Sequence, residues 1–501
     1  MKRILKLKKN ILLASLALMA MAGCTNVDEN VYDQYIEETF YGTEEGANAA
    51  LAAVYSQVAG NWNGVGYAGA DNGWYDLNCM TADEQVIPHR TTGDWQLDFA
   101  RLYKHEWLPS DFILTNTWNW LYKSIYQANR AVGLLENANA DPAKIAEAKV
   151  LRAFFYYMLI DDFGSVPFYT ENGIPADQIP QASRTEVYDF IVSELTENID
   201  LLSSTKGGEY YGRFNRWAGY ALLAKVYLNA EVYTGTAHWQ DCLAACDVIS
   251  TGGFSLHPAN TNAGSPLGNS YYELFGDMLP EDETILAMFS TVDIVSRNVY
   301  ALRSLYGPHG QALFGYSGWN GTIVPSPFYE SFADGDIRKK QFLVGDQGGG
   351  VNYTLEVGSL DNPGAAPMAG VRDVKFYPAL PLNGGGASND FPIYRYADIL
   401  LMKAECNLRL GNASTAKPFV DQVRQRAGMA VLASDPSLMD IYNERGFELN
   451  WEAHRRQDMI RFGTFLNANQ FRAASPDNHN VFPIPTDALD TNPNLQQNPG
   501  Y

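Results

Sequence analysis

The feature that most constrains how this chain folds is a succession of amphipathic segments, joined in pairs by short turns. The stretch "DPAKIAEAKVLRAFFYYMLIDDFG" shows the pattern, because Asp141 stands where a helix N-cap is expected, Pro142 suits the first helical position and Gly164 suits the end. Apolar residues recur at helical spacing in further segments: 111–138, 184–202, 214–233, 238–253, 396–411, 415–428 and 438–463. A helix with one apolar stripe must bury it against a neighbour, so these segments predict antiparallel hairpins that stack side by side.

Small residues recur where neighbouring helices are expected to cross: Ala218, Ala221, Ala224 and Ala404. Hairpins of this kind are typical of tetratricopeptide-type proteins, although the repeat here is too loose for a strict array. We predict a mostly α fold, with a superhelix of such hairpins over about 112–250 and 391–465. The regions 60–111 and 251–391 are rich in Gly, Pro, Asn and aromatic residues, which predicts an irregular, loop-rich face.

The N-terminus predicts export and lipidation. Five basic residues precede an apolar run, 11–22, that is twelve residues long, whereas a membrane-spanning helix needs about 20. The run ends in Ala-Gly-Cys, which resembles a bacterial lipobox. We therefore interpret residues 1–23 as a signal peptide, Cys24 as the residue that receives the lipid, and 24–501 as a single domain held on a membrane by acyl chains.

The composition excludes several classes of function. The chain has 36 basic and 57 acidic residues, a formal charge of −21, and loss of the five basic leader residues brings the charge to −26. Such an acidic surface repels phosphate backbones, which excludes nucleic acid as a partner and argues weakly against strongly anionic substrates. The remaining cysteines have no zinc-site spacing and are interpreted as small buried residues: Cys79, Cys242, Cys246 and Cys406.

No motif indicates a cofactor, a metal or catalysis. The stretch "GVGYAG", 64–69, matches G-x-G-x-x-G, but it lacks the preceding strand and following helix of a dinucleotide site. Neighbouring acids such as Asp161 and Asp162 do not by themselves face each other across a sugar at about 5 to 9 Å, as glycosidases require. We therefore predict a protein that is not an enzyme; a surface glycosidase is kept as an alternative that a reducing-sugar assay tests.

Several segments resemble one known family. The stretches "EAKVLRAFFYYMLIDDFGSVPF", "FPIYRYADILLMKAECNLRLGN" and "ERGFELNWEAHRRQDMIRFG", with the terminal "FPIPTDALDTNPNLQQNPGY", resemble SusD/RagB-type surface lipoproteins and follow that family's order. Asp28 and Glu29, after the lipobox, resemble the acidic signal that sends lipoproteins of Bacteroidetes to the cell surface. The resemblance spans residues 24 to 501.

The resemblance implies a lipoprotein on the surface of the outer membrane that lids a SusC-like, TonB-dependent transporter. Its role would be to bind a glycan and pass it on for import, without catalytic residues. The charged residues of the matching segments are interpreted as pairing groups that lock the hairpins together: Arg152, Arg395, Glu405, Glu448, His454 and Arg461.

The aromatic loops supply the candidate binding residues. A sugar ring has an apolar face that an indole or phenol ring covers, and a rim of hydroxyls that carboxylate, amide and guanidinium groups bind. We expect stacking from Trp95, Trp319, Trp74 and Tyr316, and polar contacts from Arg90, Asp94, Asp71 and Asn320. The segment around Trp95, "TADEQVIPHRTTGDWQLDF", also resembles a segment near the glycan site of many SusD-like proteins.

Other residues of these regions are interpreted structurally. Tryptophans with helical surroundings are expected in the core: Trp107, Trp118, Trp120, Trp217 and Trp451. Asp83 and Glu84 are expected to hold their loop, while exposure and burial remain equally open for Trp74. Two further functions stay open, namely peptide capture as in RagB-type members, which buried loop tryptophans and a deep groove would favour, and a helical scaffold without a ligand of its own.

Overall fold

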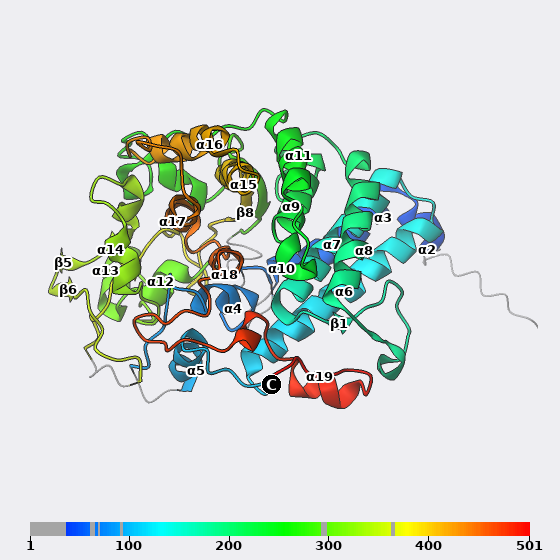
Figure 1. Ribbon diagram of the computed structural model, residues 1–501, viewed down its shortest axis with the longest axis horizontal. Helices are drawn as coiled ribbons and strands as arrows, with labels where there is room; N and C mark the ends of the chain where they lie inside the picture. The colour runs from blue at the N-terminus through cyan, green and yellow to red at the C-terminus, as the bar shows by residue number, and fades with distance from the viewer. Residues whose placement is uncertain (1–36, 61–65, 69–70, 91–93, 292–297, 362–365) are drawn as a thin grey trace, which may run out of the picture.

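The computed structural model describes residues 37–60, 66–68, 71–90, 94–291, 298–361 and 366–501. Most of the chain is helical, and the longer helices form a row that runs across Figure 1 from right to upper left. The row contains α6 (Phe112–Asn137), α7 (Pro142–Phe163), α8 (Arg184–Asn198), α9 (Arg216–Leu228), α10 (Ala230–Thr234), α11 (Trp239–Ser250), α15 (Tyr396–Arg409), α16 (Ala413–Arg426) and α17 (Leu438–Leu449). The fold class is therefore the mostly α superhelix that the sequence predicts.

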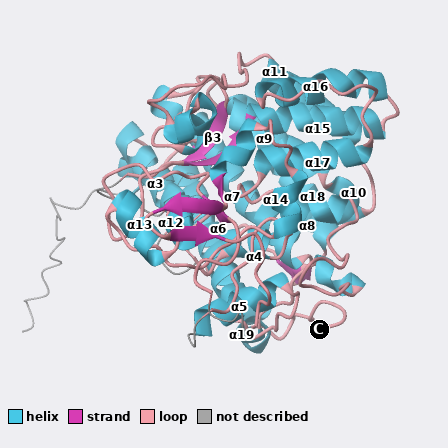
Figure 2. Ribbon diagram, turned by 90° about the vertical axis from the view of Figure 1, so that its left-hand side faces the viewer, coloured by secondary structure: helices cyan, strands magenta, loops and turns pink. Residues whose placement is uncertain are grey.

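The remaining elements surround the row. The other helices are α2 (Glu37–Tyr41), α3 (Glu44–Ala59), α4 (Trp74–Met80), α5 (Asp94–Tyr103), α12 (Tyr300–Ser304), α13 (Gly307–Phe314), α14 (Ser326–Ser331), α18 (Arg455–Arg461) and α19 (Thr486–Thr491). The strands are β1 (Val166–Pro167), β2 (Gln181–Ala182), β3 (Thr284–Met288), β4 (Phe342–Leu343), β5 (Gly345–Gly348), β6 (Val351–Tyr353), β7 (Arg372–Asp373) and β8 (Phe391–Arg395). Figure 2 shows that the strands lie beside the helices and form no layer of their own.

Local signals explain where the helices begin. The Asp141 side chain accepts a hydrogen bond from the N–H of Ala143 at 2.9 Å, with Pro142 at the first helical position of α7, as predicted. Ser183 and Glu186 form a reciprocal capping box at the start of α8, and Ser437 and Asp440 do the same for α17. Each cap satisfies backbone N–H groups that have no partner within the helix.

The order of packing places the loop-rich region within the superhelix. Successive helices pack on each other from α6 to α9, α9 packs on α11, and α11 packs directly on α15. The segment 251–391 is therefore an insertion between two helices that are neighbours in space. The antiparallel pair β3–β8, in which all ten residues are buried, joins this insertion to the start of α15.

The segment 438–463 differs from its prediction. It reads as one amphipathic run, but the structure divides it into α17 and α18 at Trp451 and Ala453, whose φ angles are 59° and 62°. The Trp451 N–H donates to the Glu84 carboxylate at 3.1 Å, and the Lys375 ammonium donates to the Asn450 carbonyl at 2.6 Å. These partners come from other parts of the chain, so helical periodicity cannot reveal the break.

Buried ion pairs hold the hairpins together, as expected. Arg152 pairs with Glu194 at 2.5 Å, and Arg461 pairs with Glu405 at 2.7 Å. Arg395, fully buried, contacts three carboxylates: those of Glu283, Glu448 and Glu452. His454 differs from this expectation: burial lowers its pKa to about 3, so the ring is neutral, and its Nδ1 lies 3.4 Å from the Lys225 ammonium. Because a buried charge without a partner is costly, these pairs specify how the helices meet.

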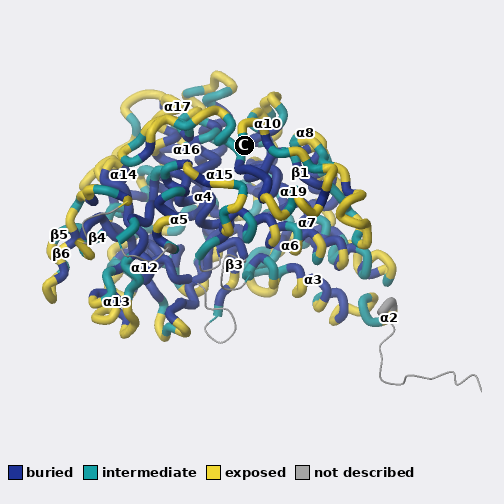
Figure 3. Tube along the Cα trace, turned by 90° about the horizontal axis from the view of Figure 1, so that it is seen from below, coloured by how far each residue is buried: buried dark blue, intermediate teal, exposed yellow. Residues whose placement is uncertain are grey.

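The core and the surface separate clearly in Figure 3, where buried segments fill the middle of the molecule and exposed segments its rim. The main apolar cluster runs from Ala47 to Ile484. The cysteines are buried and unpaired, as expected: Cys79, Cys242, Cys246 and Cys406. Within the described ranges, no helix is long and apolar enough to span a membrane. The expected signal peptide and lipidation site, including Cys24, lie outside the described residues.

Candidate functional site

Two isolated β-bridges bring three loop segments together. One lies between Val86 and Ile323, which exchange two backbone hydrogen bonds of 2.8 and 3.0 Å, and the other between Val324 and Val371. The segments around these residues therefore lie side by side, although they are far apart in sequence. They carry most of the predicted binding residues.

The turn after α13 is held against α12. The backbone N–H groups of Trp319, Asn320 and Gly321 donate to carbonyls of α12 and of the residue after it, at 2.8 to 2.9 Å. Asn320 adopts a left-handed conformation with φ 56°, which asparagine tolerates better than most residues. The Trp319 side chain is partly exposed on this turn. The backbone bonds thus fix the position of a surface indole.

Trp95 lies directly against this turn. A Cβ on Gly321 would come within 2.9 Å of Trp95 Cη2, so only glycine allows the ring so close. On its other side, the Trp95 ring contacts Phe99 edge-to-face, with centroids 5.9 Å apart. Trp95 is partly exposed and packs with one part of its ring on the core. The structure therefore places Trp95 against the turn that carries Trp319, although the two residues were predicted from separate loops, and we call the surface around this contact the candidate face.

The segment 71–76, which carries Asp71 and Asp76, joins the same region through Arg303. The Arg303 guanidinium pairs with Asp76 at 2.8 Å and lies 5.8 Å from the Phe99 ring. Asp71, half-buried nearby, is the accessible acid of this segment. Burial, and next the charge of Asp76, raise the pKa of Asp71 to about 6, while Arg303 opposes the shift.

Two arginines complete the face. Arg90 donates through both terminal nitrogens to the carbonyls of Ala366 and Ala369, at 2.8 and 2.5 Å. Arg372 donates to Asn320 Oδ1 at 2.8 Å. Burial lowers the pKa of Arg90 to about 10, and burial together with the charge of Arg90 lowers the pKa of Arg372 well below its usual value. Arg372 and Gly321 were missed from the sequence, because their contacts are long-range and neither stands in a motif.

The remaining predicted residues have different outcomes. Tyr316 is 41% exposed, and its ring lies beside Gly385, where a Cβ would be 2.8 Å from Tyr316 Cε1. Trp74 is only 3% exposed and packs on Tyr67 with ring centroids 4.4 Å apart, so the prediction of a stacking role for Trp74 is wrong. Its helix, α4, is buried along its whole length, which removes the ring from any sugar. The side chain of Asp94 lies outside the described part of the structure.

The structural interpretations of neighbouring residues are confirmed. Asp83 accepts two hydrogen bonds from Arg455, at 2.7 and 2.9 Å, and Glu84 accepts from the Trp451 N–H. Four of the tryptophans expected in the core are buried: Trp107, Trp118, Trp120 and Trp451. The fifth, Trp217, is partly exposed. Among the residues that the structure describes, no group of His, Cys, Asp and Glu side chains is arranged to hold a metal ion.

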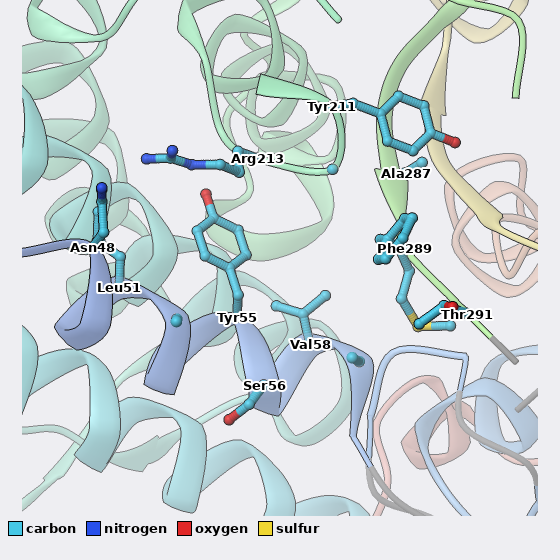
Figure 4. A pocket seen from close by; sticks show the side chains of 14 residues that line it. Asn48, Leu51, Tyr55, Ser56, Val58, Tyr211, Arg213, Ala287, Phe289 and Thr291 are labelled. Carbon is cyan, nitrogen blue, oxygen red and sulfur yellow. The ribbon is translucent and has the colours of Figure 1, made fainter. Parts of the chain in front are cut away.

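A separate hollow of about 540 Å³ lies between α3 and the end of β3 (Figure 4). Tyr55 and Arg213 lie on one side, and Phe289, 48% exposed, lies on the other. The Tyr55 hydroxyl donates to Glu147 at 2.6 Å, and Arg213 pairs with Glu147 at 2.7 Å, so these polar groups are already satisfied. The hollow thus offers mainly apolar surface, and it contains none of the predicted binding residues.

Comparison with known proteins identifies the family. The model of the SusD family matches residues 310–501, and a model described as "starch-binding associating with outer membrane" matches residues 63–228. SusD-like protein P25 of Formosa agariphila is 27% identical over 93% of this chain and 94% of its own length, and the starch-binding protein SusD of Bacteroides thetaiotaomicron is 26% identical over 71% of this chain and 72% of its own.

Solved structures share the fold. Surface glycan-binding protein A of Bacteroides thetaiotaomicron, in complex with laminarihexaose, superimposes with a TM-score of 0.72 at 21% identity, covering 91% of this chain and 99% of that one. The two family models match residues 63–228 and 310–501, and the shared fold covers 91% of the chain, so both comparisons point to the same family. The chain belongs to the SusD/RagB family.

Proposed function

We propose that the protein is a surface-exposed, lipid-anchored protein that captures oligo- or polysaccharide and delivers it to a SusC-like, TonB-dependent transporter. The observation that supports the proposal is that the Trp95 ring lies against Gly321, two residues from the partly exposed Trp319. Asn320 follows Trp319 in the turn, and Asp71 and Arg90 stand on segments that the Asp76–Arg303 pair and the Val86–Ile323 bridge join to this region, so the three residues offer acceptors and donors for hydroxyls.

The geometry suits a ligand that has a flat apolar face and hydrated hydroxyl groups. A partly exposed indole can cover the apolar face of a sugar, and the Trp95 ring is also packed against the core. A stacked sugar buries little area and gives up water from its hydroxyls, so the affinity of one site is expected to be modest. A lipid on Cys24 and a transporter alongside would offset this by raising the local concentration.

The relatives support the choice of ligand class. The name of the Bacteroides thetaiotaomicron relative describes starch binding, and the structurally similar surface protein was solved with laminarihexaose. The description of the N-terminal family match names association with the outer membrane, which agrees with the proposed lipid anchor. We infer capture without catalysis, because Asp76, the acid beside Asp71, is buried in an ion pair with Arg303 and does not face Asp71 across an open cleft.

Isothermal titration calorimetry with plant, host and fungal glycans tests the proposal. A Trp95→Ala/Trp319→Ala double variant is expected to lose at least tenfold in affinity for any glycan that the unaltered protein binds. Trp217→Ala is the matched control, since Trp217 is also partly exposed but lies on α9. Unchanged binding by the double variant would show that the site is elsewhere, and a reducing-sugar assay on the same glycans separates binding from hydrolysis.

Peptide capture is the second candidate, and the apolar hollow beside α3 favours it. A side chain of a bound peptide would find aliphatic and aromatic surface there, next to Phe289. If peptides are the ligand, Phe289→Asp abolishes retention of a casein digest on the immobilised protein, whereas the double tryptophan variant retains it. If glycans are the ligand, the double tryptophan variant loses glycan binding, whereas Phe289→Asp keeps it.

A further inference from the structure

Arg372 differs from the other fully buried arginines of the described chain. Arg303, Arg338 and Arg395 each pair with at least one carboxylate at 2.6 to 2.8 Å. Arg372 is equally buried, but its hydrogen-bond partners are neutral, namely Asn320 Oδ1 and the carbonyl of Pro367, both at 2.8 Å. Its Nε and Nη1 have no hydrogen-bond partner among the residues that the structure describes.

Arg90 donates to the same short segment as Arg372, because its bonds go to the carbonyls of Ala366 and Ala369 and that of Arg372 goes to Pro367, and Arg90 is short of partners too. A guanidinium has five N–H donors. Among the described residues, Arg90 donates to two backbone carbonyls only, and its buried Nε has no partner there. None of the ion pairs among the described residues includes Arg90 or Arg372. The phenol ring of Tyr353, 5.0 Å from the Arg372 guanidinium carbon, provides the remaining electron-rich contact.

Two guanidinium groups that have no counter-charge among the described residues are costly in a protein interior, and an anion would relieve that cost. Both belong to the face described above, because Arg372 holds the side chain of Asn320, the neighbour of Trp319. The partly exposed guanidinium of Arg90 is the group that a ligand can reach, while the buried Arg372 adds positive potential behind it.

We propose that this face selects glycans that carry an acidic group, either the carboxylate of a uronic acid or a sulfate ester, and binds that group at Arg90. The inference rests on the proposed function, since it names the class of glycan for the same site. A planar guanidinium with free N–H donors suits either group, because both present oxygens that accept two parallel hydrogen bonds.

The acidic composition of the whole chain does not oppose this local preference. Charges more than about 8 Å apart are largely screened at physiological ionic strength, whereas a contact between Arg90 and an anion is screened much less. The net charge of the mature chain slows the approach of an acidic polymer, and the two arginines act on the bound state. The sequence-based argument against anionic substrates therefore applies to the rate at which an acidic polymer approaches, and not to its affinity once bound at Arg90.

The test compares acidic polysaccharides with derivatives that lack only the charge. Calorimetry at low salt uses a uronic-acid polymer and its carboxyl-reduced form, and a sulfated polymer and its desulfated form. We expect one of the two parents to bind at least tenfold more tightly than its neutral derivative, which also identifies the anion. Arg90→Gln is expected to remove this difference, and Arg101→Gln, which deletes the same charge from a solvent-facing ion pair of α5, is expected to keep it.

The outcomes separate this inference from the proposed function. The acidic-glycan inference is overturned, and glycan capture is left standing, if both parents bind no more tightly than their neutral derivatives. An Arg90→Gln variant that folds and keeps the preference has the same consequence. Absence of binding to every glycan of the panel overturns both. Thermal unfolding of each variant, monitored by circular dichroism, shows whether a lost preference reflects lost folding.

Discussion

The guanidinium of Arg303 and the carboxylate of Asp76 form an ion pair of 2.8 Å in which both side chains are almost completely buried. This pair joins the segment that carries Asp71 to α12, and the carbonyl groups at α12 hold the turn that carries Trp319. One ion pair thus links two parts of the candidate site that are more than two hundred residues apart in sequence.

Arg303→Met is expected to destabilise the protein by about 3–5 kcal/mol, because Asp76 would remain as a buried charge without its partner. Urea denaturation followed by circular dichroism measures the change. Arg101→Met is the control, since its pair with Asp111 is about one-fifth to one-quarter exposed and such pairs contribute about 1 kcal/mol or less. Similar losses in the two variants would contradict a structural role for the buried pair.

Gly321→Ala is expected to weaken glycan binding and to lower stability by about 1–3 kcal/mol. The new methyl group would lie 2.9 Å from Trp95 Cη2 and 3.2 Å from the Arg303 carbonyl oxygen, so the indole must move away from the turn. Calorimetry and urea denaturation measure the two effects. Gly335→Ala, at an exposed glycine with open space around its Cα, should change neither.

Glycan binding is expected to strengthen as the pH rises from 5 to 7. The pKa of Asp71 is raised to about 6, so the side chain changes over this interval from a neutral acid to a carboxylate that accepts stronger hydrogen bonds from sugar hydroxyls. Asp71→Asn should weaken binding at pH 7 by about tenfold and remove most of the pH dependence, since a hydrogen bond to a charged group contributes about 1.5–3 kcal/mol. An unchanged pH profile in Asp71→Asn would place Asp71 outside the site.

The raised pKa of Glu84 is expected to make the protein less stable as the pH rises. Burial raises the pKa of Glu84 from 4.5 to about 8, against the opposing charge of Arg455. Between these values the folded protein keeps a proton that the unfolded chain releases, so the contribution of Glu84 to stability falls as the pH rises from about 4.5 to 8. The loss amounts to a few kcal/mol at most, at about 1.4 kcal/mol per pKa unit.

Glu84→Gln imitates the protonated side chain, so it should flatten the fall in stability over this interval. Urea denaturation at pH 5 and pH 8 measures the difference between the variant and the unaltered protein. Glu330→Gln, on the exposed side of α14, is the control for loss of an acidic group. Parallel pH profiles for the unaltered protein and Glu84→Gln would mean that Glu84 is ionised in the folded state.

Helical periodicity and capping residues were sufficient to predict the superhelix. Asp141, Pro142 and Gly164 act through contacts within one or two helical turns, so their effect is visible in a short stretch of sequence. The tryptophans were harder to interpret, because the same loop composition surrounds Trp74, which is buried, and Trp95, which is partly exposed. Burial depends on what packs above a residue, and that is not local information.

The sequence alone determined the fold class, the paired charges of the helical segments and the loops in which a binding face had to be sought, since each depends on spacing or on residue type. Only the tertiary structure decided which loops meet. The contact of Trp95 with Gly321 arises from bridges between distant segments, and so does the lack of a charged partner for Arg90 and Arg372 among the described residues. Whether a charged side chain has a partner depends on which residues lie next to it in the folded protein, and the order of residues along the chain does not show this.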